Sequence, residues 1–176
     1  GDVGMVAAIY HVPSGAHEEG AALDVLAKIL SSAPSGRLYK ALVEPKLAAD
    51  VGAFAFQLRE PGVLITYARV RKDDDLAKAR TAMDGAIAGA ITTPPTAEEV
   101  DRAKTQLLKN IELTLNRSDQ VGLELSEWAA MGDWRLLFIH RDRIKKVTAQ
   151  DVARVAAAYL KPSNATNGTF IPTEKP

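Results

Sequence analysis

Three histidines, His11, His17 and His140, are the side chains of this 176-residue chain with the greatest potential to bind zinc. A helical zinc site uses two imidazoles spaced i, i+4, because that spacing places both on one face. No two of the three histidines have this spacing, and there is no cysteine to supply a thiolate. We therefore predict no metal ligands and no bound cofactor in this chain. We assign His17 to a helix start, His11 to a core or sheet-edge strand position and His140 to a solvated face.

Nucleophilic catalysis has equally little support in the sequence. Ser14 and Ser35 each lie in a Pro-Ser-Gly turn, and neither belongs to the Gly-x-Ser-x-Gly pattern that exposes a nucleophile on a strand-to-helix turn. The paired carboxylates Glu98 and Glu99 fall in the first turn of a predicted helix, where the helix dipole explains them. We predict no catalytic residue in this chain.

Arg37 and Tyr39 are the candidates for contact with a substrate. An arginine and an aromatic residue near a helix N-terminus can hold a peptide carbonyl or carboxylate. The alternative is that their apolar neighbours pack inward and Arg37 makes a structural bridge. Trp128 and Trp134 are expected to anchor a helix corner by hydrophobic packing rather than to form a cage for a ligand.

The composition predicts an ordinary globular domain without a charged partner. Lysine plus arginine and aspartate plus glutamate number 22 each, so net charge offers no attraction to nucleic acid or to an anionic membrane. No apolar run approaches the length that spans a bilayer. A chain of this length buries roughly 70% of its unfolded surface, which favours one domain over residues 1–176.

The first half of the chain predicts a strand, two helices and a hairpin. Residues 3–12 carry apolar side chains on both faces, which is typical of a strand inside a sheet. Apolar spacing predicts helices over 18–30 and 36–42. Residues 51–58 and 63–70 alternate as two strands, and Pro61-Gly62 between them suits a type II turn in which the glycine has positive φ.

The second half predicts several helices followed by a short strand. Thr96 and Glu99 have the spacing of a capping box, and residues 148–151 offer a similar cap to the last helix. The predicted elements are helices beginning after Asp75, Thr96, Ser118, Asp133 and Thr148, and a strand at 169–171. Because regular βαβ alternation is absent and a hairpin is present, we predict an α+β fold. Its mixed or antiparallel sheet carries helices packed on one face.

Five segments resemble one peptidase family in their order and spacing. They are 34–44 (PSGRLYKALVE), 60–62 (EPG), 96–104 (TAEEVDRAK), 132–134 (GDW) and 147–152 (VTAQDV). Together they span nearly the whole chain. They resemble the pitrilysin/insulinase zinc metallopeptidases, which include the mitochondrial processing peptidases and similar bacterial zinc proteases.

The resemblance implies a processing-peptidase-like, metalloenzyme-like domain that is one fragment of a larger peptidase. Family members hold zinc in an N-terminal domain through His-x-x-Glu-His, which this sequence lacks. The chain therefore resembles the non-catalytic second-type domain, and zinc is implied only for the catalytic domain of the parent. The implied partners are that catalytic domain, in the same chain or in a partner subunit, and unfolded peptides. The implied compartment is the bacterial periplasm.

One departure from the family concerns its substrate-clamping Arg and Tyr. Their places resemble Val43 and Ala49 or Asp50 in this sequence, so the clamp does not carry over. The resemblance then implies a domain that walls the peptide-binding chamber. Two alternatives stay open: a structural subunit that has lost protease activity, and an independent peptide-binding module.

Overall fold

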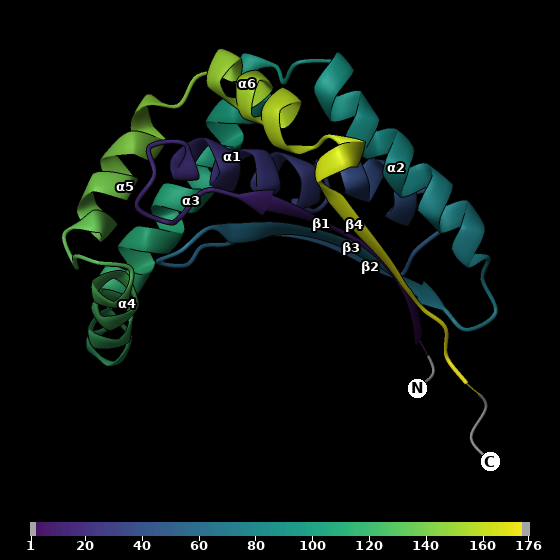
Figure 1. The fold of residues 1–176 in the computed structure, drawn as a ribbon, viewed down its shortest axis with the longest axis horizontal. Helices are drawn as coiled ribbons and strands as arrows, with labels where there is room; N and C mark the ends of the chain where they lie inside the picture. Colours follow the sequence, from purple (N-terminus) through teal and green to yellow (C-terminus); the bar gives the residue numbers. More distant parts are fainter. Residues whose placement is uncertain (1–2, 174–176) are drawn as a thin grey trace.

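The computed structural model describes residues 3–173, in which one antiparallel sheet lies beneath a layer of helices (Figure 1). The strands are ordered β2-β3-β1-β4, and each neighbouring pair is antiparallel. Their bounds are β1 (Val3–Val12), β2 (Asp50–Phe56), β3 (Gly62–Arg71) and β4 (Ala165–Phe170). The α+β prediction is confirmed, and β1 lies inside the sheet as its pattern indicates. The last strand is longer than predicted and begins at Ala165.

The helices cover one face of the sheet and leave the other open. Their bounds are α1 (Gly20–Ser31), the π-helix η1 (Tyr39–Val43), α2 (Leu76–Thr92), α3 (Ala97–Leu115), α4 (Ser118–Ala130), α5 (Leu136–Lys146), α6 (Ala149–Tyr159) and the 3-10 turn η2 (Pro162–Asn164). In Figure 1 the helical layer arches over the sheet, while α4 and α5 lie beyond one end of it. Among residues 3–173, no helix combines the length and apolar character needed to cross a membrane.

Side-chain caps explain where several helices begin. The Asp75 carboxylate accepts hydrogen bonds from two backbone amides of the first turn of α2. Thr96 with Glu99, and Thr148 with Asp151, form complete capping boxes at α3 and α6. Each box satisfies amide groups that the helix itself leaves without partners. These local signals are why the predicted starts of the three helices agree with the structure.

The core lies between the sheet and the helices. On β1 the side chains of Val6, Ala8, Tyr10 and Val12 are buried beneath the helical layer. Most of α1 is buried as well, because this helix lies between the sheet and the other helices. The core therefore needs no metal or disulfide to fill it.

The connection between β2 and β3 differs from the predicted type II turn. The hairpin itself is confirmed, with Phe56 facing Val63. Gly62 does not have the positive φ that a type II turn requires; it is the first residue of β3 and pairs with Val12. A Cβ atom at Gly62 would lie 2.2 Å from the Phe56 carbonyl oxygen, so close backbone approach is what requires glycine here.

Candidate functional site: the open face of the sheet

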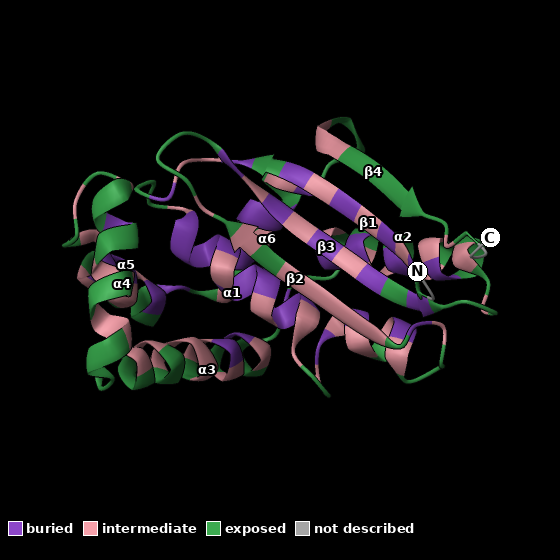
Figure 2. Cartoon of the chain, turned by 90° about the horizontal axis from the view of Figure 1, so that it is seen from below, coloured by how far each residue is buried: buried purple, intermediate pink, exposed green. Residues whose placement is uncertain are grey.

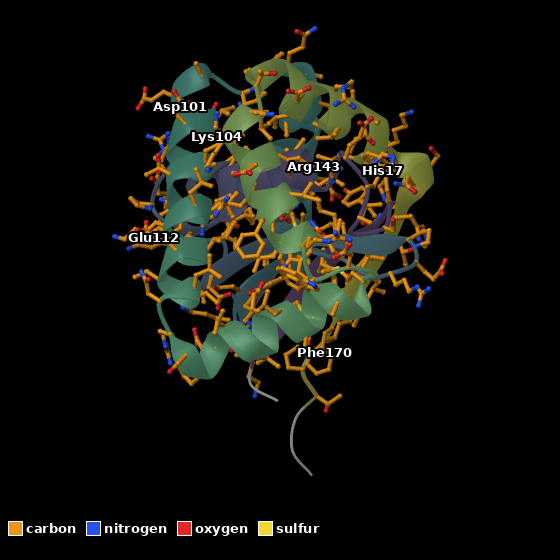
Figure 3. The ribbon with its side chains drawn as sticks, turned by 90° about the vertical axis from the view of Figure 1, so that its left-hand side faces the viewer. His17, Asp101, Lys104, Glu112, Arg143 and Phe170 are labelled. Carbon is orange, nitrogen blue, oxygen red and sulfur yellow. The ribbon has the colours of Figure 1, made fainter. Side chains whose placement is uncertain are left out.

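The three histidines occupy three different environments. His11 is exposed on β1, and His17 lies in the loop before α1, where the carbonyls of Ala16 and His17 accept hydrogen bonds from Arg143 (Figure 3). Within residues 3–173, no three His, Cys, Asp or Glu side chains are placed to hold a metal ion together. This part of the chain therefore does not offer the donor set of a zinc site.

The prediction that His140 occupies a solvated face is wrong. Its side chain is buried, its Nε2 atom lies 2.8 Å from Oδ2 of Asp24, and its ring centroid lies 5.0 Å from that of Trp128. The charged residues around it suggested exposure. However, Leu137, His140 and Ile144 share one buried face of α5, and this helical spacing was the signal that could have placed the histidine inside.

The side chain of Arg37 takes part in a network of hydrogen bonds at the start of α3. Its guanidinium donates to both carboxylate oxygens of Glu99 and to the carbonyls of Thr93 and Pro94, at distances of 2.7–3.3 Å. The hydrogen bond from Arg37 is the main reason that the pKa of Glu99 falls to about 2. Tyr39 begins the π-helix with a partly buried side chain, and its carbonyl accepts a hydrogen bond from the Glu44 amide.

The other residues noted in the sequence occupy turns and helix ends. Ser14 lies in the loop after β1, and Ser35 lies in the turn after α1. Trp128 packs inward, whereas Trp134 leaves 51% of its surface exposed, with its ring perpendicular to that of Phe138. The structure brings none of these side chains together with the histidines, apart from the Trp128–His140 contact.

The uncovered face of the sheet presents an apolar surface that the sequence alone did not reveal. Figure 2, seen from this side, shows buried residues alternating with partly exposed ones along β1 and β3. The residues facing outward include Met5, Ile9, Phe54, Phe56, Val63 and Ile65. We call this surface the open face. Phe54 and Phe56 on this face leave 44% and 54% of their surfaces exposed.

An antiparallel sheet usually turns a polar face to water, so an apolar open face indicates a surface that contacts something else. The face is concave in Figure 1, with the helical layer on its convex side. Extended chains fit such a surface, because alternate side chains of a peptide can pack between those of the strands.

Sequence comparison identifies the family to which this arrangement belongs. The sequence model of the family described as Peptidase M16 inactive domain matches residues 1–107. The comparison with curated proteins gave no match. The resemblance to pitrilysin/insulinase-type peptidases seen in the five sequence segments is thereby confirmed.

Solved structures agree with this assignment. The inactive peptidase domain of an inferred zinc protease from Bordetella parapertussis is 41% identical, with a TM-score of 0.92; the alignment covers 100% of this chain and 96% of that chain. An inferred zinc protease from Bordetella pertussis Tohama I is 39% identical over 98% of this chain and 96% of that chain, with a TM-score of 0.89. A protease from Helicobacter pylori shares the fold at 22% identity and a TM-score of 0.89, over 98% of this chain and 42% of that chain. The chain is a member of the M16 peptidase inactive-domain family.

Proposed function

We propose that this chain is the non-catalytic half of a zinc-dependent metallopeptidase. In this proposal its open face forms one wall of the chamber in which an unfolded peptide is held for cleavage. The supporting observation is the exposed apolar surface of β1, β2 and β3, on a domain in whose described residues no three His, Cys, Asp or Glu side chains are grouped to hold a metal ion. The wall binds peptide side chains, and a separate catalytic domain supplies zinc and the cleavage reaction.

The proposed partner is the catalytic domain of the same parent chain or of a partner subunit. A domain of this fold accounts for 42% of the Helicobacter pylori protease chain, so the family fold occurs within longer peptidases. The concave shape of the open face suits a partner placed opposite it, with the peptide between the two domains.

A structural role without proteolysis is the second candidate. A chain in complex III2 from Candida albicans has the same fold at a TM-score of 0.83, although only 14% of the aligned residues are identical. A purely structural subunit would keep the open face permanently covered by a neighbouring protein. Peptide binding by the open face distinguishes the two candidates.

Site-specific crosslinking tests the proposed chamber wall. A photoreactive phenylalanine analogue replaces Phe54 on the open face in one variant and Leu123 on α4 in the control. Both native side chains are exposed, at 44% and 65%. An unfolded peptide should crosslink at position 54 at least several times more than at position 123. Equal labelling at the two positions, or none at either, would remove the support for a peptide-binding wall.

A further inference from the structure

The geometry points to a carboxylate-binding site on the open face, made by Arg69 with Tyr67 beside it on β3. The ligand is an extended peptide that carries a carboxylate, from an acidic side chain or from its C-terminus, and an apolar residue nearby. This inference rests on the proposed function, since it names the kind of peptide that the chamber wall prefers.

The Tyr67 ring lies over the neighbouring strand because β2 has a glycine there. A Cβ atom at Gly52 would approach Cε1 of Tyr67 to 2.3 Å, so any other residue would displace the ring. Gly52 and Tyr67 face each other in the pairing of β2 with β3. The ring is thereby held as a flat surface next to the following outward-facing residue, Arg69.

Arg69 is held in place from two sides. Its Cζ atom lies 5.5 Å from the centroid of the Tyr67 ring, within the range of a cation–π contact. Its Nη1 atom lies 3.5 Å from Oδ2 of Asp50, the residue that faces it on β2. These contacts restrict the rotamers of Arg69, so that binding a ligand costs less side-chain conformational entropy.

The hydrogen-bonding capacity of Arg69 remains available. Arg37 and Arg80 spend their guanidinium donors on carbonyl and carboxylate groups of the chain itself. Within residues 3–173, no hydrogen bond from the Arg69 side chain accompanies its ion pair with Asp50, and the side chains of the pair are 51% and 47% exposed. Such an exposed pair contributes little, so a ligand carboxylate can replace Asp50 at low cost and form a two-bond contact.

Charges around the site are balanced before a ligand binds. Arg71 follows on the same face of β3 and lies 3.7 Å from the Asp74 carboxylate, as Arg69 lies near Asp50. When a ligand displaces Asp50 from Arg69, the half-exposed carboxylate of Asp50 is hydrated again. Asp50 keeps its charge on the neighbouring strand, so a ligand carboxylate competes with it for the donors of Arg69.

The apolar part of the site precedes Arg69 on β3. Ile65 faces Phe54 across the strand pair, and both point to the open side. Arg69 lies four positions after Ile65, which is about 14 Å along a strand. An extended peptide that follows β3 would therefore place its apolar side chain and its carboxylate about four residues apart.

Fluorescence anisotropy with three matched, labelled peptides tests the site on the purified chain. The first has isoleucine and glutamate four residues apart with an amidated C-terminus, and the second has glutamine in place of glutamate. The third keeps glutamine and ends in a free carboxylate at the next residue. The glutamate peptide should bind about tenfold more tightly than the glutamine peptide. The third peptide shows whether a terminal carboxylate is equally accepted.

Variants assign the preference to Arg69. Arg69→Gln should abolish the preference for a carboxylate, and Arg69→Lys should keep only part of it, because lysine cannot form the two-bond contact. Arg117→Gln is the matched control, since Arg117 is also exposed and paired with an aspartate. It should leave all three affinities unchanged, and circular dichroism should show that every variant is folded.

The outcomes separate this inference from the proposed function. Equal binding of the glutamate and glutamine peptides, or an unchanged preference in Arg69→Gln, overturns the carboxylate site. If Phe54→Glu still weakens all three peptides in that case, the chamber wall stands without it. Failure of every peptide to bind contradicts both.

Discussion

The guanidinium of Arg37 holds the carboxylate of Glu99 through two hydrogen bonds, of 3.0 Å from Nε and 2.9 Å from Nη2. Glu99 also accepts a hydrogen bond from the Thr96 amide as part of the capping box of α3. One carboxylate therefore caps α3 and ties it to the segment that leads into the π-helix. Both side chains are only about one-fifth exposed, so water screens the pair poorly.

Replacement of Glu99 should show how much this pair stabilises the domain. Glu99→Gln should lower the free energy of unfolding at pH 7 by about 2 kcal/mol, because a hydrogen-bonded charge pair is lost. Glu98→Gln is the control: Glu98 pairs with Arg102 at the surface, where its side chain is 84% exposed. It should change stability by less than about 0.5 kcal/mol.

The stability difference between wild type and Glu99→Gln should decrease as the pH falls. The pKa of Glu99 is about 2 in the folded chain, below its ordinary value of 4.5, so the unfolded chain binds the proton first. Its stabilising effect is complete above about pH 5 and disappears as the pH falls towards 2. Urea unfolding should show a smaller difference between wild type and Glu99→Gln at pH 3 than at pH 7. A difference that grows on acidification would contradict this account.

Two glycine substitutions should change stability in opposite directions. Gly62→Ala should destabilise the chain by at least about 2 kcal/mol, because the new Cβ atom would clash with the Phe56 carbonyl. Gly85→Ala should stabilise it by about 0.8 kcal/mol, because Gly85 lies in α2 and an added Cβ atom there would meet nothing within 4 Å. Thermal unfolding of both variants measures the contrast, and equal shifts would refute the close-approach explanation for Gly62.

His140 should be required for the packing of Trp128. In a Trp134→Phe background Trp128 is the remaining tryptophan, so its fluorescence reports on the contact alone. His140→Ala removes a buried ring and should cost about 3 kcal/mol. The emission of Trp128 should shift to longer wavelength as water reaches the indole. His17→Ala, in an exposed loop, should leave both stability and emission unchanged; a similar effect of both variants would argue against the buried contact.

Arg80 should hold the edge strand β4 in place. Its guanidinium donates to the carbonyl of Ala7 on β1 at 3.0 Å and to that of Gly168 on β4 at 2.5 Å. These two residues face each other in the register of the strands. Arg80→Met removes both donors and should accelerate amide hydrogen exchange in β4 while β3 stays protected. Arg102→Met, on the exposed side of α3, should change neither; unaltered exchange in β4 of Arg80→Met would contradict the role.

Local signals in the sequence were sufficient for most of the elements, but β4 begins at Ala165 rather than at residue 169, and α5 begins at Leu136 rather than directly after Asp133. The capping box at Thr96 and the apolar spacing that follows it placed the start of α3 where the structure has it. Alternation placed β1 and the hairpin. These features depend on neighbours within a few residues, which is why a single sequence reveals them.

Contacts between residues that are far apart in the sequence could not be predicted from local sequence patterns. Asp24 and His140 are 116 residues apart, so the residues near His140 gave no indication of its partner. The close approach of Gly62 to Phe56 depends on the geometry of the whole connection. The same holds for the open face: the alternation in β3 defines two faces, and only the packed helices decide which of them carries Ile65, Tyr67 and Arg69 outward.

Titration of the proposed zinc-bearing catalytic domain with this chain, while peptide hydrolysis is measured, tests directly whether the chain is the non-catalytic half of a peptidase. We expect that the chain alone is inactive, that it raises the hydrolysis rate to a plateau at one chain per catalytic domain, and that Phe54→Glu prevents the rise. Chelator-sensitive hydrolysis by this chain alone, or a rate unaffected by its addition, would contradict the account.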